Sequence, residues 1–254
     1  PEPSLPYYGE IKPGPDKFFC LSPLDPNEPV KFIYSSSFHK GCMHPRVDSS
    51  FTYLLPSGPG KEVQVYEMTG SDKSSAESGQ LHNLYVLRIK MRPGDTIYAA
   101  RRGLVTEVED QDGSNDAGGA SAGRENYIEI IHADCSFGHY GILRKNSALV
   151  KPGQAVKPGQ PIGLVGGDQY GRGSDIRFSV YYNREEDGQD DNKHQHTLNY
   201  IVLQCWTKGN GKGRLRHGAM YWGEFPSRLL NGETVGKGRK IKAGSKSGHS
   251  GAIK

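Results

Sequence analysis

An aspartate and an arginine stand two residues apart in the segment GSDIRFSVYY, residues 173–182. Read with the two-residue period of a β-strand, this segment places Asp175, Arg177 and Ser179 on one face and apolar side chains on the other. A carboxylate can serve as a base or a metal ligand, whereas a guanidinium stays protonated and has no lone pair to give a metal. The same pattern is typical of an ordinary solvated strand face, so the surrounding sequence decides its interpretation.

The histidines offer a second kind of chemistry, which is metal binding. His44 and Asp48 have a His-x3-Asp spacing, and His194 and His196 form a His-x-His pair that would share one face of a strand. These four residues are the candidate ligands of a relocated zinc site. The alternative is that they are unrelated surface side chains.

The four cysteines are Cys20, Cys42, Cys135 and Cys205, and none belongs to a Cys-x-x-Cys pair. A structural zinc knuckle is therefore not expected. Cys20 and Cys42 flank one short strand-like segment and are a possible disulfide, although other pairings remain open. A disulfide would be compatible with an exported protein.

The composition favours an all-β protein. Of the 254 residues, 34 are glycine and 16 are proline, and these turn formers separate short runs rich in β-branched and aromatic residues. No apolar run approaches the roughly 18 residues of a membrane span. The chain begins at Pro1 rather than at a methionine, so a secretion signal could have been removed.

The net charge of +4 is concentrated in the C-terminal tail. Residues 237–254 carry six Lys and Arg and no acid, so the rest of the chain has a net charge of 4 − 6 = −2. A basic Gly/Ser-rich tail can contact polyanions or simply keep a protein in solution. No nucleic-acid-binding motif accompanies it, and a nucleic-acid-binding function is not predicted.

Short strands alternate with turns along most of the chain. The expected strands are 29–38, 51–57, 62–70, three within 84–110, 126–134, 137–150, 173–182 and 196–207, with a last one near 218–225 that forms a hairpin with 196–207. The sequence KPGQ occurs at 151–154 and again at 157–160. Each Pro-Gly suits a tight turn that needs glycine in the left-handed region.

The order of four segments resembles one known family. These segments are GDTIYAARRGLV, ENYIEIIHAD, LRKNSALVKPGQAVKPGQPIGLVGG and GSDIRFSVYY. Together they are similar to the lysostaphin/LytM-type zinc endopeptidases, which cut peptide cross-bridges in bacterial peptidoglycan. The resemblance implies an all-β fold, with a compact antiparallel sheet or hammerhead barrel. It also implies a zinc ion held by two histidines and an aspartate, with two further histidines assisting.

When the zinc-site residues of the family are matched one by one to this sequence, the zinc ligands are missing. The family's aspartate falls on Arg88, and the histidine of its Tyr-x-His-Leu segment falls on Ile142. Its His-x-His strand falls on Asp175-Ile176-Arg177. The remaining histidine has no good equivalent, since only His82 is near. A degenerate site without zinc is therefore predicted, in which Asp175 forms ion pairs with both arginines.

The resemblance also divides the chain and suggests a function. The expected parts are an N-terminal arm with a small β extension at 1–50, the peptidase-like core at 51–183, an acidic loop with a C-terminal hairpin at 184–231, and the basic tail at 232–254. We expect a catalytically inactive, exported protein of the periplasm, cell surface or extracellular space that binds peptidoglycan or regulates a cell-wall hydrolase.

Aromatic side chains near the site are the expected ligand contacts. Tyr170, Tyr181 and Tyr182 would line a groove in which rings stack on sugars. Two alternatives to the inactive protein stay open. One is an active zinc metalloendopeptidase with non-standard ligands, and the other is a structural envelope or adhesion module.

Overall fold

The structure is a computed structural model, and it describes Asp25, Asn27 and residues 40–42, 44–70, 83–111, 125–167, 174–186 and 195–231. For residues 185, 186, 195 and 196 it describes the backbone alone. The expected strand at 29–38 and the basic tail lie outside these residues. No helix in the described part of the chain is long and apolar enough to cross a membrane.

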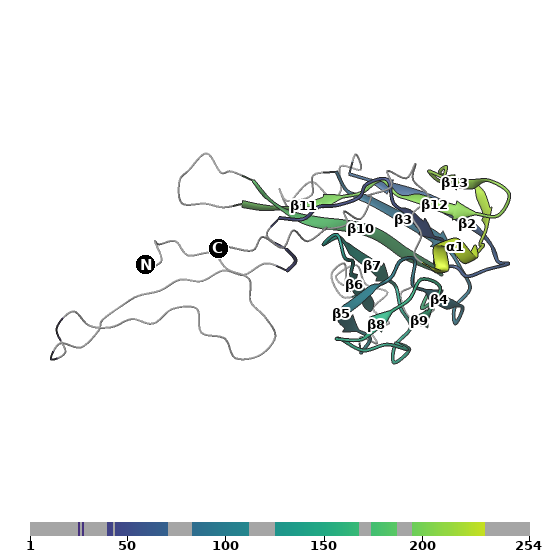
Figure 1. The fold of residues 1–254 in the computed structure, drawn as a ribbon. Coiled ribbons are helices and arrows are strands. Elements are labelled where there is room, and N and C mark those ends of the chain that lie inside the picture. Colours follow the sequence, from purple (N-terminus) through teal and green to yellow (C-terminus); the bar gives the residue numbers. More distant parts are fainter. Residues whose placement is uncertain are drawn as a thin grey trace, which may run out of the picture.

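A large antiparallel sheet forms most of the described body (Figure 1). Its strand order is β14-β2-β3-β10-β7-β6-β5-β8, and β11 pairs with the C-terminal half of β10. The strands are β2 (Glu62–Thr69), β3 (Tyr85–Lys90), β5 (Gly103–Glu109), β6 (Tyr127–Ile131), β7 (Phe137–Gly141), β8 (Ala155–Val156), β10 (Asp175–Glu186), β11 (Gln195–Tyr200) and β14 (Met220–Trp222). The all-β fold class expected from the sequence is confirmed.

Two smaller sheets and one short helix complete the described body. In the first sheet, β1 (Thr52–Leu54) pairs in parallel with β12 (Gln204–Thr207), which forms a hairpin with β13 (Gly211–Gly213). The second sheet joins β4 (Thr96–Tyr98) to β9 (Pro161–Leu164). Helix α1 (Ser227–Leu230) is a single turn. The C-terminal hairpin is thus β12–β13. The strand expected near 218–225 meets the end of β12 in a single antiparallel bridge, Thr207–Gly223, and pairs mainly with β2, where it buries Tyr221.

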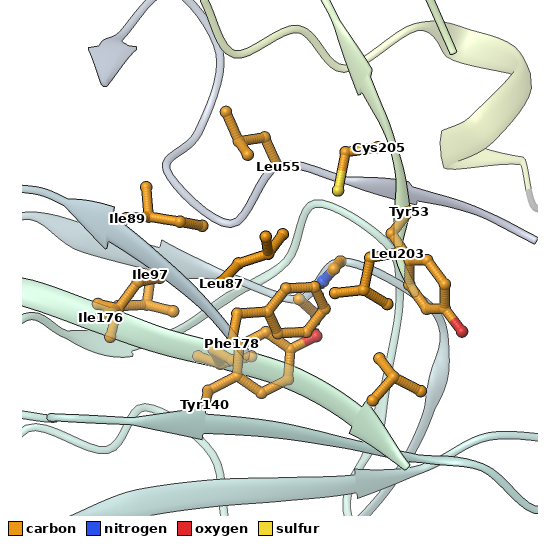
Figure 2. Packing of buried hydrophobic residues seen from close by; sticks show 14 of the residues in the cluster. Tyr53, Leu55, Leu87, Ile89, Ile97, Tyr140, Ile176, Phe178, Leu203 and Cys205 are labelled. Atoms are coloured by element: carbon orange, nitrogen blue, oxygen red, sulfur yellow. Dashed lines mark hydrogen bonds between the residues drawn. The ribbon is translucent and has the colours of Figure 1, made fainter. Parts of the chain in front are cut away.

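The core lies on one face of the large sheet. Alternation along β3 and β10 buries Leu87, Ile89, Ile176 and Phe178 completely. The Phe178 ring stacks on Tyr140 of β7 with centroids 4.9 Å apart. Figure 2 shows Tyr53, Leu55, Leu203 and Cys205 packed against this face from the smaller sheet and its neighbouring segments. Each such large apolar side chain contributes about 1.5–3 kcal/mol when it is fully buried.

The opposite face of the large sheet carries the polar side chains, and we call it the open face. Residues paired across neighbouring antiparallel strands share a face, so the strand registers trace it from one edge to the other. From β14 to β5 it carries Trp222, Tyr66, Arg88, Asp175, Arg177, Tyr181, His139, Tyr127, Glu129 and Glu107. The candidate site lies at the centre of this face.

The two KPGQ segments form the turns that their sequence predicts. Gly153 and Gly159 have φ values of +82° and +74°. The backbone N–H groups of Gln154 and Gln160 donate to the carbonyls of Lys151 and Lys157 at 3.1 Å. A proline followed by a left-handed glycine is the combination that a type II turn requires.

One disulfide joins Cys42 to Cys135, with the Cα atoms 5.8 Å apart. The predicted Cys20–Cys42 pairing is therefore wrong. The turn between β6 and β7 carries Cys135 in the left-handed region, at φ +67°, and brings it beside Cys42. Cys205 is a free, buried thiol, and burial raises its pKa to about 12.

Candidate functional site

The pairing of β3 with β10 sets two arginines opposite one another. Arg88 and Arg177 are partners in this register, and Asp175 is the partner of Lys90. Like charges directly opposite in a sheet destabilise it unless counter-charges lie close by. The paired residues 87–90 and 175–178 carry three cations and one carboxylate, and they therefore need a further acid.

Arg88 and Asp175 form the first ion pair of the site. Arg88 Nε donates to Asp175 Oδ2 at 2.7 Å, and Nη2 donates to the same oxygen. Asp175 is 5% exposed, whereas the Arg88 side chain is 38% exposed. This charge-assisted pair between a buried carboxylate and a partly exposed guanidinium holds β3 and β10 together.

Arg177 pairs with a different acid, Glu125. Its Nη1 donates to Glu125 Oε2 at 3.0 Å, so the prediction that Asp175 serves both arginines is wrong for Arg177. Gly141, the β7 partner of Arg177, makes room for this acid, because a Cβ there would lie 2.7 Å from Glu125 Oε1. His139 Nε2 lies 3.6 Å from the same oxygen. The missing acid thus comes from the residues just before β6.

Ile142 follows β7 directly and lies in the interior of the protein. It is 2% exposed, and its backbone has φ +67°, which is rare for a β-branched residue. The Ile142 carbonyl accepts a hydrogen bond from Gly166 N–H at 2.9 Å. The side chain at this position can pack, but it can neither accept nor give a proton.

These residues do not fit the zinc ion that the resemblance implies. Arg88 and Arg177 are cations without a lone pair, and an oxygen of Asp175 is already bound by Arg88. Within the described residues, no group of three or more His, Cys, Asp or Glu side chains could hold a metal ion. No step of a metal-dependent hydrolysis is therefore derived for this site.

The alternative histidine ligands are not brought together by the described residues. His44 is exposed. The Asp48 carboxylate accepts hydrogen bonds from Ser50 N–H at 2.9 Å and from the Ser50 hydroxyl at 2.7 Å, so it stabilises its own turn. His194 lies outside the described residues. His196 is opposite Glu185 in the β10–β11 pair, and its side chain is not described.

The three tyrosines expected to form a groove do not do so together. Tyr170 lies outside the described residues. Tyr181 lies on the open face, where its ring stacks on Phe137 with centroids 5.5 Å apart. Tyr182, the next residue of β10, points the other way and packs against the core. Because Tyr181 and Tyr182 lie on opposite faces of one strand, they cannot line the same groove.

A second polar cluster occupies the β5–β6 end of the open face. Lys40 forms ion pairs with Glu107 and with Glu129, the latter at 3.1 Å, and the Tyr181 hydroxyl also donates to Glu129. The hydrogen bond from Lys40 lowers the pKa of Glu107. Burial, followed by the hydrogen bond to Glu107, raises the pKa of Tyr127 to about 12.

Sequence reasoning missed this cluster and also missed Glu125. Glu129 alternates with the apolar residues of β6, and that alternation is the one local signal for its position on the open face. Glu125 ends a glycine-rich stretch with the composition of a loop, and nothing local assigns it a partner.

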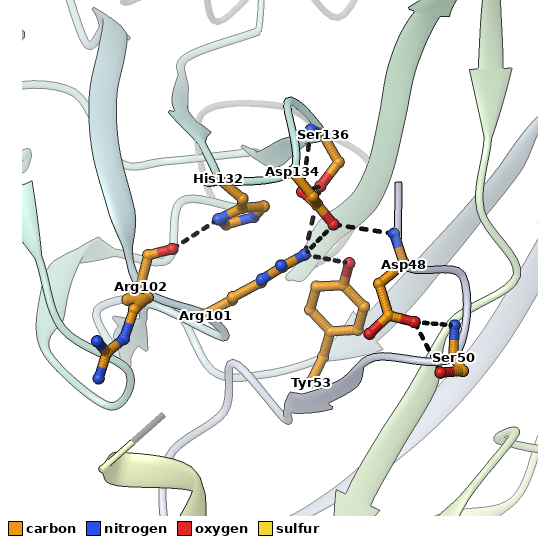
Figure 3. Close-up of polar contacts among 8 residues, drawn as sticks. All are labelled: Asp48, Ser50, Tyr53, Arg101, Arg102, His132, Asp134 and Ser136. Carbon is orange, nitrogen blue, oxygen red and sulfur yellow. Dashed lines mark hydrogen bonds and ion pairs between the residues drawn. The ribbon is translucent and has the colours of Figure 1, made fainter. Parts of the chain in front are cut away.

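A third cluster lies at the turn between β6 and β7 and supports the fold (Figure 3). Arg101 Nη1 donates to Asp134 Oδ2 at 2.9 Å, and Asp134 also accepts from Asp48 N–H and from the Ser136 hydroxyl. Burial alone would raise the pKa of Asp134, but the hydrogen bond from Ser136 and the charge of Arg101 lower it overall.

His132 lies beside this cluster and is 3% exposed. Its Nδ1 lies 2.8 Å from the Arg102 carbonyl oxygen, which fixes Nδ1 as the donor, and Nε2 has no partner among the described residues. Burial, with a further contribution from the charge of Arg101, lowers the pKa of His132 to about 4. This histidine is therefore neutral in the folded protein at neutral pH.

Comparisons with known structures give similar proteins at low identity. A zinc-containing peptidase from Vibrio cholerae is 24% identical with a TM-score of 0.36, covering 50% of this chain and 36% of that chain. Lysostaphin is 21% identical with a TM-score of 0.31, covering 60% and 51%. The SpoIIQ–SpoIIIAH pore-forming complex is 20% identical with a TM-score of 0.36, covering 52% and 85%. This chain therefore spans about a third of the first of these proteins and half of the second.

A comparison with curated proteins gives no match. Comparison with protein families gives one, to peptidase family M23, over residues 83–189. This segment is less than half of the chain and holds Arg88, Ile142, Asp175 and Arg177. Residues 83–189 of this chain are thus similar to peptidase family M23.

Proposed function

We propose that this M23 domain binds its target rather than cleaving it. The observation that carries the proposal is the β3–β10 register, which sets Arg88 opposite Arg177 and pairs each guanidinium with a carboxylate. These are two of the positions at which the family resemblance expects zinc ligands. Two fixed positive charges there repel a metal dication and cannot coordinate it.

The ion pairs take over the structural part of the metal's role. Arg88–Asp175 joins β3 to β10, and Arg177–Glu125 joins β10 to the residues before β6. A bound zinc ion would tie together the same neighbouring strands and would also activate a water molecule for hydrolysis. The ion pairs also tie the strands together, but they cannot activate a water molecule.

The proposed target is peptidoglycan or a cell-wall hydrolase that the domain regulates. M23 domains act on peptidoglycan, and the open face presents polar and aromatic side chains of the kind that contact sugars and peptides. The proposed location is outside the cytoplasm, in the periplasm, on the cell surface or in the medium. The Cys42–Cys135 disulfide supports this location, because disulfides persist in oxidising compartments. In the same proposal the basic tail adds contact with polyanions.

Two measurements on the purified, oxidised protein test the proposal. The first combines metal analysis with an assay for release of soluble fragments from peptidoglycan sacculi, and we expect neither bound zinc nor release. The second is co-sedimentation with sacculi and pull-down of cell-wall hydrolases, and we expect one of the two to retain the protein. Stoichiometric zinc together with cleavage would establish the active metalloendopeptidase instead. Failure to bind either target would favour a structural envelope module.

A further inference from the structure

Two of the buried side chains on the open face lie against Tyr181, which stacks on one and donates a hydrogen bond to the other. Phe137 is 1% exposed and Glu129 is 2% exposed. Both lie on the same side of the sheet as the half-exposed Arg177, whereas the core covers the opposite side. A segment from outside the sheet also packs on both of them.

Residues 40–42 are that segment. Gly41 lies directly against the ring of Phe137, since a Cβ on Gly41 would come within 3.0 Å of Phe137 Cε2. The Lys40 ammonium group lies between Glu107 and Glu129, and the Lys40 carbonyl accepts a hydrogen bond from the Asn183 side chain on β10. Cys42 then bonds to Cys135 in the turn between β6 and β7. The segment thus crosses from β10 to β6 on top of the open face.

The covalent bond is the strongest of these attachments. The ion pair of Lys40 with Glu107 involves two side chains that are 54% and 39% exposed, and exposed ion pairs contribute little and weaken in salt. Asp48 N–H donates to Asp134 Oδ2 at 3.1 Å and anchors the chain beyond the segment. Loss of the disulfide would leave the Asp48 anchor in place and remove the covalent cross-link that holds residues 40–42 to the turn between β6 and β7.

We infer that residues 40–42 are a disulfide-locked cover over the Phe137–Glu129 part of the open face, and that reduction of Cys42–Cys135 lifts the cover. Both cysteines are partly exposed, so a dithiol reductant can reach them. One thiolate of the reductant attacks Cys42 or Cys135, and its second thiolate resolves the mixed disulfide. The reductant leaves as a disulfide, its two protons pass to the released protein thiols, and the strands of the sheet remain paired.

The test measures how fast the Glu129 carboxyl reacts with a water-soluble carbodiimide and an amine, read by peptide mass spectrometry. Glu67 is the internal control, because it lies on β2, is held by Arg214 and does not contact the cover. On reduction with dithiothreitol, or in Cys42→Ser/Cys135→Ser, we expect the Glu129 rate to rise about tenfold, the Glu67 rate to stay constant, and reoxidation to restore protection. An unchanged Glu129 rate, or an equal rise at Glu67 that reports general loosening, would overturn the inference.

A second variant opens the cover with the disulfide intact. Gly41→Val places a branched side chain against Phe137 at a position where φ is +107°. We expect faster modification of Glu129 in this oxidised variant. Gly60→Val is the matched control, because Gly60 also has positive φ, at +73°, but faces open space. Equal Glu129 rates in the two variants would refute the assignment of Gly41 as part of the cover.

Discussion

His132 makes the stability of the protein depend on pH between neutrality and pH 4. Its pKa in the folded protein is about 4, against 6.5 for a histidine in water. The unfolded chain therefore binds a proton at a higher pH than the folded chain does. The stabilisation is complete above about pH 6.5 and is lost as the pH falls toward 4. The full difference amounts to about 3 kcal/mol, of which about 2 kcal/mol is lost by pH 5.

The structure explains why His132 resists protonation. Nδ1 already donates its proton to the Arg102 carbonyl, so the added proton would go to Nε2, which is buried and has no acceptor nearby among the described residues. The positive charge of Arg101 further lowers the pKa of His132. Protonation would therefore bury an unpaired charge.

The assay is urea unfolding of the oxidised protein at pH 7 and at pH 5, with His132→Asn as the test variant. Asparagine keeps an N–H donor for the Arg102 carbonyl and does not titrate. We expect the wild type to lose about 2 kcal/mol more than His132→Asn between the two pH values. The exposed His44→Asn should keep the wild-type pH dependence.

Parallel pH dependence in the wild type and in His132→Asn would refute the reasoning. Asp134 does not confuse the comparison, because its pKa is lowered below the usual value of 3.8 and its contribution is lost at lower pH. If His132→Asn does not fold, NMR titration of the His132 ring in the wild type gives the pKa directly. A value near 6.5 would contradict the structure.

Three further predictions concern the ion pairs and the turns. Asp175→Asn leaves Arg88 unpaired beside Arg177 and should lower the free energy of unfolding by about 1–3 kcal/mol. Glu125→Gln should lower it less, because both members of the Arg177–Glu125 pair are partly open to water. Urea unfolding measures both losses, and a larger loss in Glu125→Gln would contradict this order. Arg177→His alone should give neither bound zinc nor peptidoglycan cleavage, because Arg88 and Ile142 remain; metal analysis and fragment release check this, and activity would show that the residue assignments are wrong. Gly159→Ala should lower the thermal stability of the protein more than Gly153→Ala does. Both glycines have positive φ, but a Cβ at 159 would lie 2.8 Å from Leu230, whereas a Cβ at 153 would meet nothing. Equal losses in thermal unfolding would refute the role of that contact.

Local sequence signals predicted most of the strands. The two-residue alternation of segments such as 84–90 and 173–182 depends only on which face meets the core, and the structure confirms it in β3 and β10. The KPGQ turns were predictable for the same reason, since proline and glycine fix their own backbone angles.

Partners that are distant in sequence could not be predicted. The Cys42–Cys135 disulfide, the Arg177–Glu125 pair and the insertion of Lys40 between Glu107 and Glu129 each join segments separated by 52 or more residues. No periodicity carries such information. The resemblance placed Arg88 and Arg177 near one another, and the register of two strands was needed to assign each its own acid.

The parallel pairing of β1 with β12 has a consequence for biosynthesis. Thr52 pairs with Gln204, and β2 pairs with β14 as well as with β3, so part of the pairing of the early strands needs strands that come late in the chain. While the polypeptide emerges in order from a ribosome or a translocation channel, Tyr53 and Leu54 have no partner strand and remain available to chaperones. A chain that ends before Gln204 would therefore expose β1 as an unpaired strand, and such a strand is prone to aggregate with other chains.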